Sequence, residues 1–373
     1  MHALKSALIA LLLLMLTACS GGQKDEFRVG VILPMTGQTA TYGEESWNGI
    51  QMALDELKAE GFDCVLTLRD DKSLKTDAGN QAKYLIENEG VHALLGSVQS
   101  SNTEQIALVA KEAGVPLITP ASTNDTLTKN GGPLVSRICF DDKFQGAVLA
   151  NFAADQGWKR AVAVVDKAQV YSTGLAGNIK TAFAGRGGSF REEYYVTQDT
   201  DFANTIQNVA NEKPDVIFLC GYYAEGGLMI RQAKERWAGI PLVAGDGFDS
   251  PKLGELVGET NAQIFLSSHF AGDAPDPKVQ AWAKRYKERF GKMPGAMAGL
   301  GYDVLKVLAD AAKRCKDRKD RAELGRAIAA TADYPGITGR ISLTTPDRTP
   351  IKDAVIMKVD AGLKYYATVP ARN

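Results

Sequence analysis

A group of hydroxyl side chains that follow apolar, strand-like runs is the first feature of this 373-residue chain that could bind a ligand. Its members are Ser100, Ser101, Thr103, Ser122 and Thr123. Ser100 and Ser101 stand where an amphipathic helix is expected to begin, and hydroxyls beside the N–H groups of a helix start can hold an anion. Plain N-capping would also place serine there, so both interpretations stay open on local grounds.

A second group offers aromatic rings and one carboxylate. It comprises Tyr171, Tyr222, Tyr223 and Asp246, which stands between two glycines. A turn would also use Asp in this setting, but a carboxylate inside a cleft can pair with a cation. An unpaired buried charge is very unfavourable, so each charge of a buried ligand needs a partner. The hydroxyl group would bind the negative end of a ligand, the carboxylate would bind a positive end, and the aromatic rings would contact an apolar side chain. These three features together suit a zwitterion with an apolar side chain. An α-amino acid fits that description.

These residues belong to a passage that occurs twice. The first copy is ALLGSVQSSNTEQIALVAKEAGVPLITPAS (Ala93–Ser122), and the second copy is VIFLCGYYAEGGLMIRQAKERWAGIPLVAGDG (Val216–Gly247). Each copy predicts an apolar strand, a polar loop, an amphipathic helix and a second apolar strand. Strands that alternate with helices form parallel sheets, and ligands bind beyond the carboxyl ends of such strands. We therefore expect two Rossmann-like α/β lobes that face each other across a cleft.

The same alternation extends on both sides of the repeat. We expect a strand over Phe27–Leu33 and helices over Ser46–Ala59 and from about Leu175 to Ala184. This pattern leaves Tyr42 and Tyr171 in equivalent loops, each between a strand and its helix.

The C-terminal part of the chain is too short for a third lobe of this kind. The segment RISLTTPDRTPIKDAVIMKV predicts a hairpin that turns at Pro346-Asp347. We expect residues 27–140 plus 268–340 to form the N-terminal lobe and residues 141–267 plus 341–373 to form the C-terminal lobe. The chain would then cross between the lobes more than once, which makes a multi-strand hinge.

The N-terminus has the pattern of an exported lipoprotein. Lys5 precedes an apolar run that is too short to span a bilayer permanently, and the run ends in Leu-Thr-Ala-Cys, which resembles the bacterial lipobox. Residues 1–18 are expected to be a signal peptide, Cys19 the lipid-attachment site and residues 19–26 a polar tether. An ordinary signal peptide followed by a chance cysteine is the alternative.

The remaining composition argues against several function classes. A net charge of −1 gives no basic excess for nucleic acid. GxSxG, HExxH, GxxxxGK and GxGxxG motifs are absent, and the sequence suggests no metal site, cofactor or catalytic residue. His92, at the start of an expected strand, and His269, at the end of an expected strand that enters a hinge, have ordinary structural interpretations. Four further cysteines, which form no CxxC pair, are expected to be mostly free thiols: Cys64, Cys139, Cys220 and Cys315.

Together these segments resemble the ABC-transporter substrate-binding proteins for branched-chain amino acids. The resemblance runs from about Phe27 to the C-terminus and rests on VGVILPMTGQTATYGEESWNGIQMALDELKAEG, LLGSVQSSNT, VPLITPASTNDTLT, DKAQVYSTGLA, CGYYAEGGLMIRQAK and VAGDGFDSPKL. It implies the type I periplasmic binding protein fold, with two lobes that close around a ligand by a hinge motion. It also implies delivery of the ligand to a membrane permease driven by an ATPase.

The resemblance assigns a role to eight residues, one position at a time. Ser100, Ala121 and Thr123 match positions that hold the ligand's carboxylate and ammonium, and Val98 matches an apolar wall. Tyr42 matches the aromatic of the side-chain pocket, whereas Tyr171 and Tyr222 match tyrosines that close over the ligand. Asp246 stands where the leucine/isoleucine/valine-binding protein has Glu, the partner of the ammonium. Because Asp is one methylene shorter, the identity of the ligand stays open.

We therefore expect a monomeric, lipid-anchored binding protein on the periplasmic or outer face of a bacterial membrane. Its ligand would be Leu, Ile or Val, with other amino acids also open. One alternative is a sensing module of the same fold for an amide, urea or another small metabolite. Another is an exported hydrolase that uses His269 and a serine.

Overall fold

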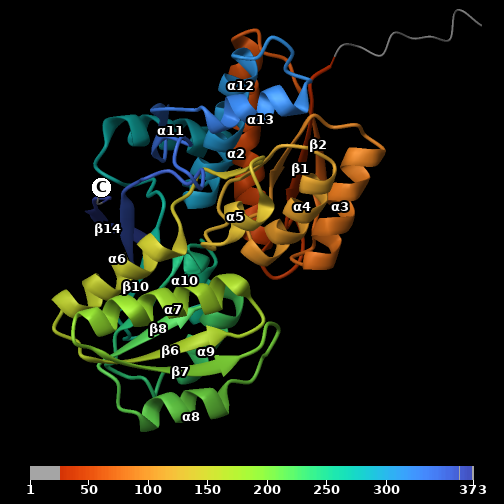
Figure 1. Ribbon diagram of the computed structural model, residues 1–373. Coiled ribbons are helices and arrows are strands. Elements are labelled where there is room, and N and C mark those ends of the chain that lie inside the picture. Colours follow the sequence, from red (N-terminus) through yellow and green to blue (C-terminus); the bar gives the residue numbers. More distant parts are fainter. Residues whose placement is uncertain (1–25, 361, 372–373) are drawn as a thin grey trace, which may run out of the picture.

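Two β-sheets, each with its own helices, make up this molecule (Figure 1). The computed structural model describes residues 26–360 and 362–371. The expected signal peptide, Cys19 and nearly all of the expected tether lie outside these residues.

The first sheet has five parallel strands in the order β2-β1-β3-β4-β5. Its strands are β1 (Arg28–Leu33), β2 (Val65–Asp70), β3 (Ala93–Gly96), β4 (Leu117–Thr119) and β5 (Val135–Arg137). The helices between them are α2 (Ala40–Ala59), α3 (Lys75–Glu87), α4 (Ser100–Glu112) and α5 (Leu127–Gly131). This order places the carboxyl ends of β1, β3 and β4 side by side.

The second sheet has seven strands in the order β14-β13-β10-β9-β8-β6-β7. The parallel strands are β6 (Arg160–Asp166), β7 (Ser189–Tyr195), β8 (Val216–Cys220), β9 (Leu242–Ala244) and β10 (Ile264–Ser268). The antiparallel strands are β13 (Ala354–Val359) and β14 (Leu363–Val369). The intervening helices are α6 (Asp142–Asp155), α7 (Val170–Gly185), α8 (Ala203–Asn211), α9 (Tyr223–Ala233), the single turn η1 (Asp246–Phe248) and α10 (Leu253–Val257).

The chain passes between the two sheets three times, after β5, after β10 and before β13. After β10 it forms α11 (Pro277–Phe290), α12 (Ala296–Lys313) and α13 (Arg321–Ala329), then the short pair β11 (Tyr334–Gly336) and β12 (Gly339–Ile341). The α12 helix lies against α2 of the first sheet (Figure 1). The predicted fold class, two α/β lobes joined by a multi-strand hinge, is confirmed, while the exact lobe boundaries stay a prediction.

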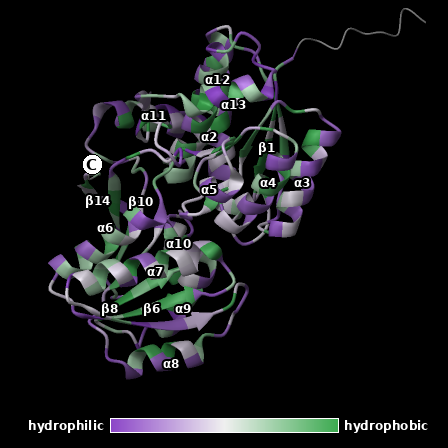
Figure 2. Cartoon of the chain, viewed as in Figure 1, coloured by the Kyte–Doolittle hydropathy of each residue, from purple (hydrophilic) through white to green (hydrophobic). Residues whose placement is uncertain are grey.

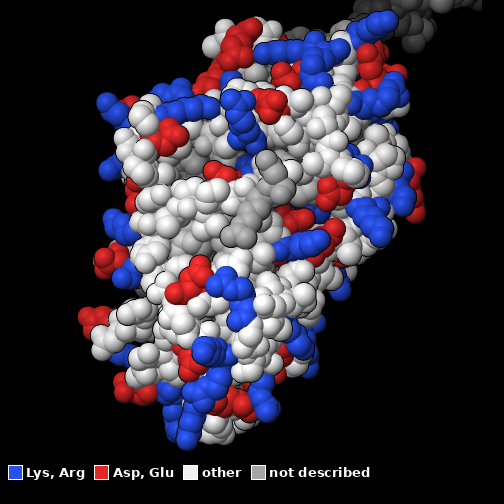
Figure 3. All heavy atoms as spheres, turned by 60° about the vertical axis from the view of Figure 1, so that its left-hand side comes forward, with Lys and Arg blue, Asp and Glu red and all other residues white. Residues whose placement is uncertain are grey.

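Apolar strands pack under amphipathic helices in both halves of the molecule. Buried core residues include Val29 and Val31 in β1 and Ile217 and Phe218 in β8, all 0% exposed. The inner strands β6 and β8 of the second sheet accordingly appear hydrophobic in Figure 2, whereas the edge strand β7 is hydrophilic. On the face shown in Figure 3, Lys and Arg side chains are interspersed with Asp and Glu.

Two expected elements differ from the structure. The helix predicted from Ser46 begins at Ala40, and the one predicted from about Leu175 begins at Val170. Tyr42 and Tyr171 therefore lie in the first turns of α2 and α7 rather than in loops. Each helix begins with a polar, glycine-containing turn that lacks the apolar periodicity from which the helix was predicted.

The predicted C-terminal hairpin is wrong, although its turn exists. The Arg348 N–H donates to the Thr345 carbonyl at 3.0 Å, which closes a turn over Pro346 and Asp347. The strand before this turn, β12, pairs with β11, and the strand after it, β13, pairs with β10 and β14. The Arg348 side chain instead donates to the carbonyl of Val135 in β5 at 2.7 Å. The segment around the turn thus contacts β5 of the first sheet, and the expected pairing of the strands before and after the turn does not form.

Candidate functional site

All eight residues expected to contact the ligand line one cavity between the two sheets, which we call the central cavity. They are Tyr42, Val98, Ser100, Ala121, Thr123, Tyr171, Tyr222 and Asp246, together with Gly247 and Met297. The central cavity measures ≈ 10 Å³, which is about the space of one water molecule. An amino acid can therefore enter only if the residues on the two sides move apart.

The hydroxyl side of the central cavity lies at the start of α4. Ser100 is the first residue of α4, and the N-cap position belongs to Gln99, whose side chain makes no capping hydrogen bond. The Ser100 hydroxyl instead accepts from the backbone N–H of Asn124 at 3.3 Å, and it is 1% exposed. N-capping by Ser100 is thus not what the structure shows. The first-turn N–H groups of α4 and this hydroxyl can together bind a carboxylate.

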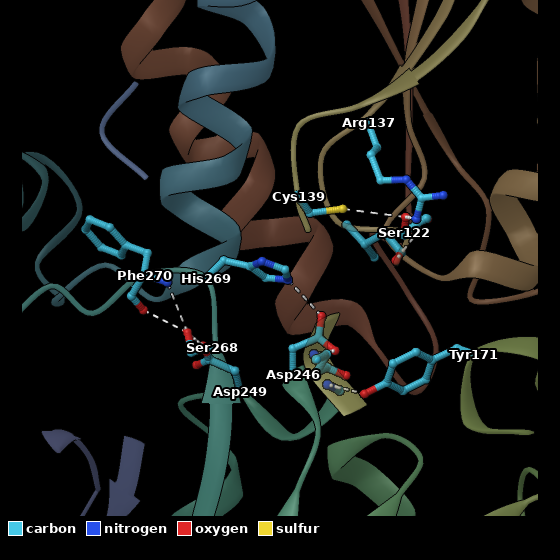
Figure 4. A network of polar contacts seen from close by, with 12 residues as sticks. Ser122, Arg137, Cys139, Tyr171, Asp246, Asp249, Ser268, His269 and Phe270 are labelled. Atoms are coloured by element: carbon cyan, nitrogen blue, oxygen red, sulfur yellow. Dashed lines mark hydrogen bonds and ion pairs between the residues drawn. The ribbon is translucent and has the colours of Figure 1, made fainter. Parts of the chain in front are cut away.

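A buried arginine holds the loop that carries Ala121 and Thr123. The Arg137 guanidinium is fully buried and donates to the carbonyls of Ser122 and Asn124 at 3.0 and 2.8 Å (Figure 4). These two bonds fix the backbone on either side of Thr123. Sequence reasoning missed this residue because an arginine in a three-residue strand carries no local signal of a partner fifteen residues back.

The aromatic side is fixed by hydrogen bonds to one glycine. The Tyr42 hydroxyl donates to the Gly247 carbonyl at 2.5 Å, and the Gly247 N–H donates to the Tyr171 hydroxyl at 3.0 Å. The Tyr171 ring stacks on Tyr222 with centroids 5.3 Å apart. Burial raises the pKa of all three phenols well above the ordinary value. The hydroxyls are therefore neutral at physiological pH and can act as donors.

Asp246 is held on both of its carboxylate oxygens. Gln145 in α6 donates its side-chain amide to Oδ1 at 2.8 Å, and His269 places Nε2 3.0 Å from Oδ2 (Figure 4). Burial lowers the pKa of His269, so the ring is neutral and donates through Nε2. His269 follows β10 directly, in a segment that crosses between the sheets. The expected position at a strand end that enters the hinge is confirmed.

A second buried carboxylate, which sequence reasoning missed, lies next to the central cavity. Asp142 is fully buried, and neither of its carboxylate oxygens makes a hydrogen bond within the usual distance, although the Thr123 hydroxyl lies close enough to lower its pKa. Its N–H donates to the Thr123 carbonyl at 2.9 Å. Burial, followed by the charge of Asp246, raises its pKa well above the ordinary value. The pair Asp142 and Asp246 makes this end of the site suited to a cation.

Several hydrogen bonds tie the two sides together around the central cavity. Ser101 in α4 accepts from the Val170 N–H at 3.3 Å, and the Asn124 amide donates to the Val170 carbonyl at 3.0 Å. On the other side, the hydroxyls of Thr41 and Ser250 lie 3.0 Å apart. Any separation of the two sheets would have to break these bonds.

The described part of the chain shows neither a metal-binding cluster nor a membrane-spanning helix. Residues 26–360 and 362–371 hold no group of three or more His, Cys, Asp or Glu side chains that could bind a metal. The cysteines in these ranges are free, as expected: Cys64, Cys139, Cys220 and Cys315. No helix within the same ranges is long and apolar enough to cross a membrane.

The two sheets, three crossings and central cavity are those of a two-lobed α/β solute-binding protein. The sequence profile of a family described as periplasmic binding protein matches residues 26–364. The chain therefore belongs to this family, and the expected resemblance is confirmed.

Relatives with known names share most of their length with this chain. The Leu/Ile/Val-binding protein BraC3 of Rhizobium johnstonii is 28% identical over 324 residues, which cover 85% of this chain and 87% of the relative. The leucine-, isoleucine-, valine-, threonine- and alanine-binding protein of Pseudomonas aeruginosa is 26% identical, with 76% of this chain and 77% of the relative covered.

Solved structures show the same arrangement. The leucine-binding protein LivK of Thermotoga maritima is 36% identical, with a TM-score of 0.88 over 92% of this chain and 98% of its own. The branched-chain amino acid transporter substrate-binding protein LivJ of Streptococcus pneumoniae, solved with isoleucine, is 29% identical, with a TM-score of 0.84 over 92% and 99%. A solute-binding protein from R. palustris, solved with benzoate, is 22% identical with a TM-score of 0.85 over 93% and 97%, and shares the fold.

Proposed function

We propose that this protein is the substrate-binding component of an ABC importer and captures an α-amino acid, with Leu, Ile and Val as the favoured ligands. The single observation that carries the proposal is the division of the central cavity. Ser100, Ala121 and Thr123 face it from the first sheet, whereas Tyr171, Tyr222 and Asp246 face it from the second. An anion-binding side opposite a carboxylate side matches the two ends of a zwitterion.

The carboxylate of Asp246 separates this ligand class from others that the fold can hold. A benzoate-type ligand brings only an anion, and it would leave Asp246, which lines the central cavity, without a cationic partner in a buried site. An amide or urea carries no positive charge and would also leave the buried carboxylate without a cationic partner. An ammonium supplies the missing positive charge and can donate hydrogen bonds to Asp246, while Asp142, just outside the cavity lining, adds negative charge when it is ionised.

Binding would proceed by closure of the hinge. The ligand would dock through its carboxylate on the start of α4, and the second sheet would then bring Tyr171, Tyr222 and Asp246 over the ammonium and the side chain. A ligand favours the closed form only by its higher affinity for that form. The bonds of Ser101, Asn124 and Thr41 to the opposite side contribute to the same closed arrangement.

The ligand class is tested by thermal unfolding with each proteinogenic amino acid, and with benzoate, urea and propionamide. Leu, Ile or Val at a hundred times its Kd should stabilise the folded protein by about 2.7 kcal/mol, whereas the three compounds without an ammonium should have no effect. A response to benzoate alone, or to none of the amino acids, would overturn the proposal.

We further propose that Cys19 carries lipid and holds the protein at the periplasmic or outer face of the membrane. Cys19→Ser should abolish incorporation of labelled palmitate in the bacterial host and release the protein from the membrane fraction. Cys315→Ser is the matched control, because it removes a half-buried free thiol elsewhere in the chain and should leave labelling unchanged. Labelling that persists in Cys19→Ser would exclude this anchor.

A further inference from the structure

A second, larger cavity lies beside the hinge, and we call it the acidic cavity. It measures ≈ 240 Å³ and is lined from the first half of the molecule by Glu45 in α2 and by residues 293–295 before α12. From the other half it is lined by Asp249 after η1 and by residues 362–364 around the start of β14. The crossing segment of residues 270–273 completes its wall.

Glu45 is an unusual residue to find in such a wall. It is 1% exposed, and its Oε2 atom is buried without a hydrogen-bond partner. Lys292, the nearby cation, makes its ion pair with Glu44 at 2.7 Å instead. Glu45 therefore places a buried carboxylate in the wall of the acidic cavity, with one oxygen that accepts no hydrogen bond. Such a buried, unpaired carboxylate is unfavourable unless it gains a partner or a proton.

Asp249 brings a second buried carboxylate to the same cavity. It is 2% exposed, and the Ser268 hydroxyl donates to its Oδ2 atom (Figure 4). Asp273 also lines the cavity, but both of its oxygens accept from the Tyr365 N–H at 3.2 Å. Lys364 is the cation in the lining. Three carboxyl groups and one ammonium leave the acidic cavity with a negative balance once the carboxyl groups are ionised.

The rest of the lining is apolar and includes the side chains of Phe270, Met293, Pro294 and Met357. We propose that the acidic cavity binds a small organic cation, a primary ammonium with a short apolar body, between the carboxylates of Glu45 and Asp249. The ammonium would satisfy both buried carboxylates, and the aromatic and thioether walls would cover its hydrocarbon part.

A metal ion fits this cavity less well than an ammonium. Ca²⁺ takes six to eight oxygen ligands, and Mg²⁺ requires near-octahedral geometry. Within residues 26–360 and 362–371, no cluster of three or more metal-binding side chains exists. An ammonium needs only a few acceptors and tolerates apolar neighbours.

The test is a calorimetric titration of the full chain with n-propylammonium chloride at pH 9. Binding should be measurable in the unchanged protein and should persist in Asp246→Asn with at most a modest change, because Asp246 lines the central cavity and acts on the acidic cavity only through its charge near Asp249. Glu45→Gln, which keeps the shape and removes the charge, should weaken binding at least about tenfold, and Asp249→Asn should do the same. Asp55→Asn is the control, since it removes an exposed carboxylate from the same helix.

Several outcomes would overturn the proposal. They are an absence of propylammonium binding, equal affinity in Glu45→Gln, equal binding of the uncharged 1-propanol, or Glu45-dependent binding of Na⁺ or Ca²⁺ in its place. Propylammonium binding that is lost in Asp246→Asn would assign the cation to the central cavity. Amino-acid binding is measured separately in each variant, so failure here is distinguishable from failure of the proposed function.

The pH dependence gives an independent readout. Burial, followed by the charge of Asp249, raises the pKa of Glu45 to about 8, and burial raises the pKa of Asp249 to about 7. Other ionisable groups near the pair are Lys292, Glu44, Tyr223 and Tyr286 around Glu45, and Asp246 and Tyr42 around Asp249. Because the cation competes with a proton, its affinity should rise as the pH increases from about 6 to about 9.

The same shift affects folding without the cation. A carboxyl whose pKa is raised in the folded state stabilises the fold below its unfolded pKa, and this stability is lost as the pH rises through the folded value. Between about 4.5 and about 8, unfolding temperatures of the unchanged protein should therefore fall relative to those of Glu45→Gln. Propylammonium should reduce that difference, and an identical pH profile in the two proteins would contradict the buried-carboxylate argument.

Discussion

Asp246→Asn should weaken amino-acid binding by ~2–5 kcal/mol, because the ligand's ammonium would lose its charged partner in a buried site. The substitution keeps the size of the side chain, and its amide oxygen can still accept a hydrogen bond from Gln145 or His269. The fold should therefore survive. Titration calorimetry with leucine, or with whichever amino acid the unfolding screen identifies, measures the loss directly.

The matched control is Asp215→Asn, which removes a carboxylate that bonds to Lys159 and Arg160 at the far end of the same sheet. Its affinity for the amino acid should not change. Asp142→Asn and the double variant then complete a cycle that measures how strongly the two carboxylates act together. An affinity of Asp246→Asn equal to that of the unchanged protein would remove Asp246 from the ammonium site.

Arg137→Met should lower the free energy of unfolding by ~3–5 kcal/mol, because two hydrogen bonds from a charged donor are lost. The two buried carbonyls would keep one donor each, the Cys139 thiol for Ser122 and the Leu127 N–H for Asn124. Methionine fills most of the space but donates no hydrogen bond to Ser122 or Asn124. Urea unfolding, followed by circular dichroism, measures the change. Ligand affinity should fall as well, since the loop between those two residues carries Thr123.

Arg186→Met is the comparison for this prediction. Arg186 is exposed and pairs with Asp155 on the surface, and such pairs contribute about 0–1 kcal/mol. If Arg137→Met unfolds at the same urea concentration as Arg186→Met, then the buried guanidinium does not stabilise the loop in the way proposed here.

The sequence carried most of the information about where the central cavity lies. Strand ends in a parallel sheet converge on one edge, so Ser100, Ala121, Tyr222 and Asp246 could be expected to meet without any knowledge of side-chain packing. Tyr42 was expected in the same place but on the wrong element, because a helix start without a strong cap is hard to locate.

What could not be predicted depends on contacts between distant segments. Asp142 and Arg137 matter because each is enclosed by loops from elsewhere in the chain, and burial of this kind leaves no local pattern. The C-terminal hairpin failed for a related reason. Pro346 and Asp347 indicate a turn, but turn chemistry does not determine which strands will pair. In the structure, Arg348 forms hydrogen bonds with Val135 and Arg137 of β5.

The three crossings also determine the order in which the molecule can complete its folding. The strands of the first sheet are finished at Arg137, yet α12, which packs against α2, is synthesised only after the whole run from β6 to β10. The second sheet likewise remains incomplete until β13 and β14, at the end of the chain, have been synthesised. A nascent fragment can bury the core under α3 and α4, whose residues all lie between Ile32 and Val135. The remaining core of each half is complete only when nearly the full chain is available, and contacts this distant in sequence should slow that last step.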